Sequence, residues 1–127
     1  MNKNNIAALF DEWNITLQTK DPKKVTALYD SNSILLPTVS NKIRHNHEEI
    51  ENYFTDFLPQ EPVGKIDEAN IRIFDHIAIN SGVYTFTLKD HSTVQARFTF
   101  VYRWNGKRWM IIEHHSSPIQ QILTQTI

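Results

Sequence analysis

The sequence has 127 residues, of which 40% are hydrophobic and 11% aromatic, so it can build the core of one domain over residues 1–127. Its formal net charge of -1 leaves no basic surplus for phosphates or anionic lipids, so we expect no nucleic-acid partner and no membrane partner. Cysteine is absent, which excludes disulfides, thiolate zinc sites and cysteine nucleophiles and is typical of the reducing cytoplasm, the expected location.

The N-terminal part of the sequence has the apolar spacing of helices. Apolar residues recur every three or four positions over residues 6–17, and Asn4 or Asn5 is in place to cap the first turn. Asp21 followed by Pro22 predicts the cap and first turn of a short second helix.

A brief strand and a third helix are expected next. Residues 33–37 read as the strand. Asn46 with Glu49 three residues later has the form of a capping box, and apolar residues follow at helical spacing until Pro59. Residues 59–64, with two prolines and a glycine, predict a connector.

The second half of the sequence alternates between apolar and polar residues, as strands do. Four such segments, which predict an antiparallel meander, lie at residues 71–74, 77–88, 93–104 and 108–116. Asn105 and Gly106 predict a type I′ hairpin turn, because that turn needs positive φ at both central residues and this pair tolerates it. Gly82 offers a place for a β-bulge.

Helices followed by a meander predict the α+β class, with helices on one face of an antiparallel sheet, since each element buries its apolar side on the other. Long strands coil under their own twist, so the sheet is expected to curve and leave a pocket. Trp13 of the first helix and Tyr53 of the third helix carry apolar faces that we expect at this pocket.

Two segments carry a resemblance to a known family. They are LYDSNSILLPT at residues 28–38 and ARFTFVYRWNGKRWMIIEHHSS at residues 96–117. The sequence resembles the NTF2-like superfamily and, within it, the association (hub) domain of calcium/calmodulin-dependent protein kinase II and the SgcJ/EcaC-type bacterial proteins. The resemblance covers nearly the whole chain and implies a cystatin-like cone, with three N-terminal helices packed on a strongly curved antiparallel sheet.

The resemblance also implies partners. It implies a homodimer formed through the outer face of the sheet, sometimes multiplied into rings, and a cavity that binds small polar or anionic ligands in some members. In the hub pattern this cavity is lined by arginines, whereas the matching positions of this sequence hold Phe86, Val101 and Ser116. An anion pocket of the hub type would therefore need another cation.

Arg97 is the candidate for that cation. It shares one face of its predicted strand with Thr99, two residues away, and its planar guanidinium can hold a carboxylate in a bidentate manner. Asp11 matches the acidic partner of a pocket arginine in the hub, so the resemblance implies an Asp11–Arg97 pair. The alternative is that Arg97 and the neighbouring acids Asp11 and Glu12 are solvated surface residues.

The other face of the same strand is aromatic and fits either the core under the helices or a buried subunit contact; it holds Phe98, Phe100, Tyr102 and Trp104. Adjacent His114 and His115 point to opposite faces of the last strand, so at most one can line the cavity. The family motif matches best at His115, with Ser117 on its face. Either histidine would act as a hydrogen-bonding group or general base, or as a structural residue.

We expect no metal and no cofactor. His45 and His47 flank the cap of the third helix, but zinc needs three or four ligands of defined geometry, and surface histidines beside a cap are the plainer interpretation. The sequence has no Gly-rich phosphate loop, nucleophile elbow or dinucleotide fingerprint.

Two functions remain open. The first is a homo-oligomerising, hub-like domain that binds a small molecule in its cone-shaped cavity. The alternative is an enzyme similar to ketosteroid isomerase or SnoaL, acting on a small polar or polycyclic substrate. Such an enzyme needs a carboxylate base, yet Asp75 and Asp90 fall in predicted turns and the strands hold few other acids. Whether the chain catalyses a reaction is left undecided.

Overall fold

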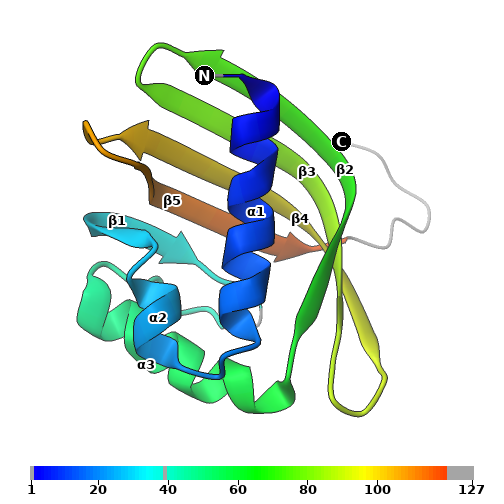
Figure 1. The fold of residues 1–127 in the computed structure, drawn as a ribbon. Helices are drawn as coiled ribbons and strands as arrows, with labels where there is room; N and C mark the ends of the chain where they lie inside the picture. Colours follow the sequence, from blue (N-terminus) through cyan, green and yellow to red (C-terminus); the bar gives the residue numbers. More distant parts are fainter. Residues whose placement is uncertain (1, 39, 120–127) are drawn as a thin grey trace.

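The computed structural model describes residues 2–38 and 40–119 and shows helices packed on a five-stranded sheet (Figure 1). The helices are α1 (Lys3–Leu17), α2 (Pro22–Thr26), α3 (His47–Phe57) and the 3-10 helix η1 (Leu58–Gln60). The strands are β1 (Tyr29–Leu36), β2 (Val63–Phe74), β3 (Ile77–Thr87), β4 (Thr93–Trp104) and β5 (Trp109–Pro118). The α+β class predicted from the sequence, with N-terminal helices packed on a sheet, is confirmed.

The predicted caps of α2 and α3 form: Asn46 accepts a hydrogen bond from the Glu49 amide at 2.9 Å, and Asp21 accepts one from the Lys23 amide at 3.0 Å. The capping box predicted at Asn46 is only half formed, because the Glu49 carboxylate accepts from the His45 amide and not from the Asn46 amide. α1 is capped by Asn2 instead of Asn4 or Asn5, and the Asn5 side chain accepts a hydrogen bond from the Asn2 amide. An asparagine at this reciprocal position does the work of the usual Glu or Gln.

The strand order is β1-β5-β4-β3-β2. β2 to β5 form the predicted antiparallel meander, and β1 joins the opposite edge as a parallel neighbour of β5. β2 begins at Val63, so the predicted strand over residues 71–74 is too short and the predicted connector over residues 59–64 is too long. A register shift between Ile66 and Glu68 interrupts the alternation that would have revealed the whole strand.

Gly82 lies beside that irregularity. A Cβ atom at Gly82 would come within 1.9 Å of the Glu68 carbonyl oxygen, so only glycine fits this close approach of β3 to β2. The bulge is therefore near the predicted place, but the extra residue is in β2, across from Val83 and Tyr84.

The β4–β5 hairpin differs from the predicted type I′ turn. Gly106 has φ of +99°, but Asn105 is not among the residues with positive φ in the described chain. The Asn105 side chain instead accepts hydrogen bonds from the amides of Lys107 and Arg108, each at 2.9 Å. This local bonding favours a wider loop, which an Asn-Gly pair also permits.

α1 crosses one face of the sheet, here called the inner face (Figure 1). On β4 this face presents Ala96, Phe98, Phe100 and Tyr102, all buried, so the aromatic face belongs to the core. Trp13 packs edge-on against Phe100 with ring centroids 5.5 Å apart. The opposite, outer face of β4 holds Gln95, Arg97, Thr99, Val101 and Arg103, and none of the described helices covers it.

Candidate functional site

A small pocket opens between α3, the end of β1 and the inner face of the sheet. Its volume is about 60 Å³. Most of the wall is aliphatic or aromatic, and its polar members are Trp13, Thr38, Tyr53, Gln60, Tyr84, His114 and Ser116. None of the described lining residues is an acid, a lysine or an arginine, so the wall holds no permanent charge.

A continuous chain of hydrogen bonds runs behind and along this wall. The Trp13 indole donates to the Tyr29 hydroxyl at 3.2 Å, and that hydroxyl lies 2.8 Å from Nδ1 of His114. On the other side of the imidazole, Nε2 lies 3.1 Å from the Tyr84 hydroxyl. The Tyr84 hydroxyl donates to Ser116 at 2.6 Å, so one buried histidine joins two tyrosines.

The chain ends at the pocket. Thr38 forms a short hydrogen bond with Ser116, and both side chains line the pocket. Thr38 lies just beyond the end of β1, and Ser116 lies near the end of β5, the parallel neighbour of β1. Because the two strands are parallel, their C-terminal ends lie side by side, which brings the two hydroxyls together.

His114 is held in its neutral form. Burial lowers the pKa of His114 to about 3, and the neighbouring His115 adds a smaller effect in the same direction. The pKa of Tyr84 is raised by burial, partly offset by its bond to Ser116, and burial raises the pKa of Tyr53 to about 12. The polar groups of the pocket are therefore uncharged at neutral pH, and His114 is a weak base.

The structure brings three of the seven predicted cavity residues to this pocket: Trp13, Tyr53 and His114. Each comes from a different element, α1, α3 and β5, and each is buried. The apolar faces of α1 and α3 and one histidine of β5 thus meet at this pocket.

The other four predicted residues lie elsewhere. Arg97 and His115 are exposed on the outer face of the sheet, Thr99 is half-buried there, and Asp11 is exposed on α1. The Asp11–Arg97 pair is therefore not formed, because the sheet lies between the inner helix and the outer arginine. The aromatic face of β4 is the one that turns to α1, since it buries far more apolar surface than the Arg97 face would.

Four members of the polar chain were not among the predicted cavity residues: Tyr29, Thr38, Tyr84 and Ser116. Tyr29 and Thr38 lie in the segment LYDSNSILLPT that carried the family resemblance, but no pattern in the sequence assigned them a chemical role. Tyr29 is completely buried with a polar group, and a buried hydroxyl needs a partner. That signal depends on knowing its burial, which the periodicity of a short strand does not supply.

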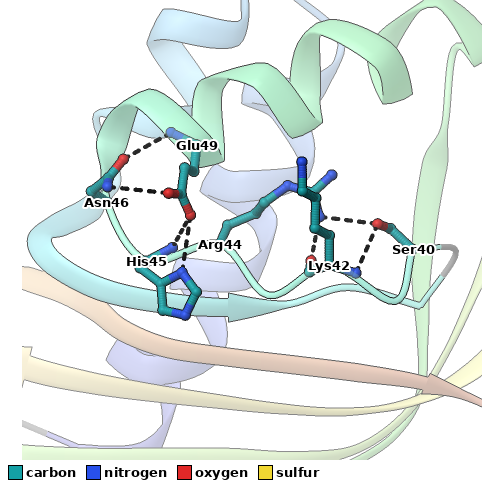
Figure 2. A network of polar contacts seen from close by, with 6 residues as sticks. All are labelled: Ser40, Lys42, Arg44, His45, Asn46 and Glu49. Carbon is teal, nitrogen blue, oxygen red and sulfur yellow. Dashed lines mark hydrogen bonds and ion pairs between the residues drawn. The ribbon is translucent and has the colours of Figure 1, made fainter.

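A second polar network holds the loop between β1 and α3 (Figure 2). Arg44 donates to Ser40 at 3.0 Å and also to the Lys42 carbonyl, and its guanidinium lies 5.3 Å from the ring centroid of Tyr53. The loop that follows Thr38 is thereby attached to one wall of the pocket.

Glu49 fixes the other end of the same loop, at the start of α3 (Figure 2). Its carboxylate accepts from the His45 amide at 2.9 Å and lies 3.0 Å from the His45 ring nitrogen. The backbone hydrogen bond from His45 lowers the pKa of Glu49. His47 is used differently, because its Nε2 lies 2.7 Å from the Tyr29 carbonyl oxygen.

Within residues 2–38 and 40–119, no group of three or more His, Cys, Asp or Glu side chains is placed to hold a metal ion. No helix in this part of the chain has the length and apolar character needed to cross a membrane.

Solved structures from three bacteria have the same fold. A Xanthomonas campestris protein, named as a candidate calcium/calmodulin dependent protein kinase II association domain, is 47% identical, with a TM-score of 0.92 over 96% of this chain and 91% of that chain. An NTF2-like protein of unknown function from Pseudomonas putida is 16% identical, with a TM-score of 0.82 over 98% of this chain and 91% of that one.

A third relative is named as a candidate ketosteroid isomerase, from Parabacteroides distasonis. It is 21% identical, with a TM-score of 0.75 over 94% of each chain, and this likeness shows the fold alone. No curated protein matches the sequence. Residues 2–120 match the family described as calcium/calmodulin dependent protein kinase II association domain. The chain therefore belongs to the calcium/calmodulin dependent protein kinase II association domain family.

Proposed function

We propose that this chain is a self-associating domain, in which copies meet through the outer face of the sheet and each copy holds a small molecule in its inner pocket. The observation that carries the first part is the composition of the outer face. Its centre holds apolar side chains that are only half-buried in the single chain, here called the outer patch: Ile77, Ile79, Val83, Val101 and Met110.

The outer patch extends over three strands, with Arg103 inside it. Ile79 is the register partner of Val101, and Ile77 and Met110 lie on either side of Arg103. A sheet face of this kind would bury these side chains on meeting a second copy, which is the usual driving force of association. Membership of an association-domain family supports self-association in the same direction.

The outer patch is bordered by charge and polarity. Arg97 and Glu113 are exposed beside it, at register positions next to Val83 and Val101. A polar rim around an apolar centre is the common anatomy of protein interfaces. Arg97 lies on the same face of β4 as Val101, so it would lie at the rim of the proposed contact between copies.

The enzymatic alternative has less support. An isomerase of the ketosteroid type needs a carboxylate base, and no acid is among the described lining residues of the pocket. His114 is the strongest base in the wall, but its pKa of about 3 makes it a poor proton acceptor at neutral pH. Ligand binding without proton transfer is the function that this pocket supports better.

Val101→Lys tests the proposed contact. The new lysine would face Glu113 across the β4–β5 pair, so the single chain should tolerate it, whereas a contact between copies would bury the charge. We expect light scattering to show an oligomer for the unmodified 14.9 kDa chain and a shift to monomer for the variant.

Ile15→Lys is the matched control. Ile15 is 68% exposed on α1, on the other side of the molecule from the outer patch. The control should keep the oligomeric state of the parent chain. A parent chain that is monomeric at micromolar concentration, or a Val101→Lys variant that remains fully assembled, would rule out this interface.

A further inference from the structure

The direction of the buried hydrogen-bond chain is set by its first member. An indole N–H can only donate, so the Tyr29 oxygen accepts from Trp13 and the Tyr29 proton is left for another partner. The available partner is Nδ1 of His114, at 2.8 Å. This arrangement fixes the tautomer of the neutral imidazole, with its single proton on Nε2.

The remaining protons follow in order. Nε2 of His114 donates to the Tyr84 oxygen, and the Tyr84 hydroxyl donates to Ser116. Ser116 has then accepted one proton, and either Ser116 or Thr38 can donate in the bond between them. Donation from Ser116 continues the chain in one direction, with each hydroxyl accepting from one side and donating to the other.

With Ser116 as the donor, the last proton, on the Thr38 hydroxyl, has no acceptor among the described residues. Thr38 makes no other hydrogen bond in this part of the chain, and it lines the pocket. Tyr53 contributes a second hydroxyl to the wall that has no hydrogen-bond partner among the described residues. This side of the pocket thus presents two hydroxyl donors.

Charge and size restrict the ligand further. The described wall offers no cation to compensate a carboxylate or phosphate, and an uncompensated charge is costly to bury. The pocket has a volume of about 60 Å³, so it fits a small compound or the end of a larger one.

We propose that the pocket binds a small uncharged carbonyl compound, whose oxygen accepts the Thr38 proton at the end of the Trp13–Tyr29–His114–Tyr84–Ser116 chain. This inference rests on the proposed function and names the ligand class of the same pocket. It replaces the polar or anionic ligand expected from the family resemblance by a neutral acceptor, because the arginine offered for an anion lies on the outer face.

Acetone and acetate form a matched pair of probes, because they have nearly the same shape and differ in charge. The indole N–H signal of Trp13 in a ¹H–¹⁵N NMR spectrum reports on the pocket wall, and Trp13→Phe assigns it. The indole signals of Trp104 and Trp109, which pack on each other at the β4–β5 hairpin, report any general solvent effect. We expect acetone to shift the Trp13 signal saturably at millimolar concentrations, and acetate to leave it in place.

Variants at Thr38 test the assigned donor. Thr38→Val removes the hydroxyl at nearly constant shape and should weaken acetone binding about fivefold or more, the usual effect of one hydrogen bond. Thr38→Ser restores the hydroxyl and should restore binding. Thr55→Val is the control, because the Thr55 hydroxyl is exposed and bonds only to the Glu51 carbonyl within α3.

Three results would overturn the inference: no saturable shift of the Trp13 signal with acetone, acetate binding as tightly as acetone, or unchanged acetone binding in Thr38→Val. Light scattering on the same samples separates this failure from that of the proposed contact between copies. An oligomer that ignores acetone contradicts only the ligand class, whereas a monomer that binds acetone contradicts only the self-association.

Discussion

The imidazole of His114 lies face to face with the ring of Phe100, with ring centroids 4.0 Å apart and planes inclined by 20°. The two residues are register partners on neighbouring strands, β5 and β4. Trp13 packs edge-on against the same imidazole, at 5.5 Å and 90°. This aromatic enclosure removes water from His114 while two tyrosine hydroxyls satisfy its nitrogens, so the neutral ring is stabilised and the charged ring is not.

The first prediction concerns the effect of pH on stability. The pKa of His114 is about 3 in the folded chain, below the value of about 6.5 for an unfolded histidine. Between these values the unfolded chain binds one more proton, so stability is fully present above pH 6.5 and is lost as pH falls toward 3. We expect the free energy of unfolding to drop by about 2 kcal/mol from pH 7 to pH 5, measured by urea titration at fixed protein concentration.

His114→Gln is the control for this titration, because glutamine donates and accepts hydrogen bonds but does not titrate. The variant should be less stable at pH 7 and should lose most of the pH dependence between 7 and 5. The carboxyl groups with lowered pKa, Glu49, Asp67 and Asp90, act below pH 5 and leave this window clear. A parallel pH dependence in the variant and the parent chain would contradict the assignment to His114.

A second prediction compares two buried tyrosines. Tyr84→Phe removes a hydroxyl that bonds both His114 and Ser116, and it leaves their buried polar atoms without that partner. The expected cost is about 1 to 3 kcal/mol in the free energy of unfolding. The Tyr102 hydroxyl is buried but has no partner among the described residues, so Tyr102→Phe should be neutral within about 0.5 kcal/mol or stabilising.

Chemical denaturation of both variants, with the same protein concentration and buffer, measures this difference. Equal losses of stability in Tyr84→Phe and Tyr102→Phe would show that the hydrogen-bond chain contributes nothing beyond ring packing. The comparison is internally matched, because each variant removes one oxygen from a fully buried ring on the inner face.

The helices and the meander could be predicted from the sequence because their signals are local. Caps such as Asn46, and apolar periods such as that of α1, require only neighbouring residues. The parallel pairing of β1 with β5 could not be predicted in this way, since it joins segments that are far apart in the sequence. The pocket depends on that pairing, which places Thr38 beside Ser116.

The two-residue alternation of β4 could not by itself predict which face of the strand packs against α1. Alternation separates Arg97 from Phe98 but does not say which side meets α1. The family resemblance favoured the arginine side, and the burial of three rings, Phe98, Phe100 and Tyr102, decided for the other. Similarly, the pair His114 and His115 was correctly split between two faces, while the family motif pointed to His115 and the structure turns His114 inward.

A third prediction concerns two glycines that are needed for different reasons: Gly82 for lack of space and Gly106 for its positive φ. Gly82→Ala places a methyl group within 1.9 Å of the Glu68 carbonyl oxygen, so the backbone of β2 or β3 must move, at a cost of about 2 kcal/mol or more. Gly106→Ala meets no atom within 4 Å but must adopt φ near +99°, and it should cost about 1 kcal/mol. Thermal unfolding of the two variants measures the order, and a larger loss for Gly106→Ala would contradict it.

The last prediction concerns the attachment of α1 to the start of β2. The Asn14 side chain accepts a hydrogen bond from the Gly64 amide at 2.8 Å and donates one to the Gly64 carbonyl at 3.0 Å, as a neighbouring strand would. Asn14→Ala removes both bonds and should lower the free energy of unfolding by about 2 kcal/mol.

Two further variants show whether this loss arises from the paired geometry. Asn14→Asp keeps the acceptor for the Gly64 amide but turns a carboxylate toward the Gly64 carbonyl, so it should be no more stable than Asn14→Ala. Gln18→Ala, one turn later, removes single bonds to the Asn14 and Pro62 carbonyls and should cost less than about 1 kcal/mol. If Asn14→Asp were as stable as the parent chain, the hydrogen bond to the Gly64 carbonyl would contribute nothing, and the bond from the Gly64 amide and the apolar face of α1 would hold the helix to the sheet.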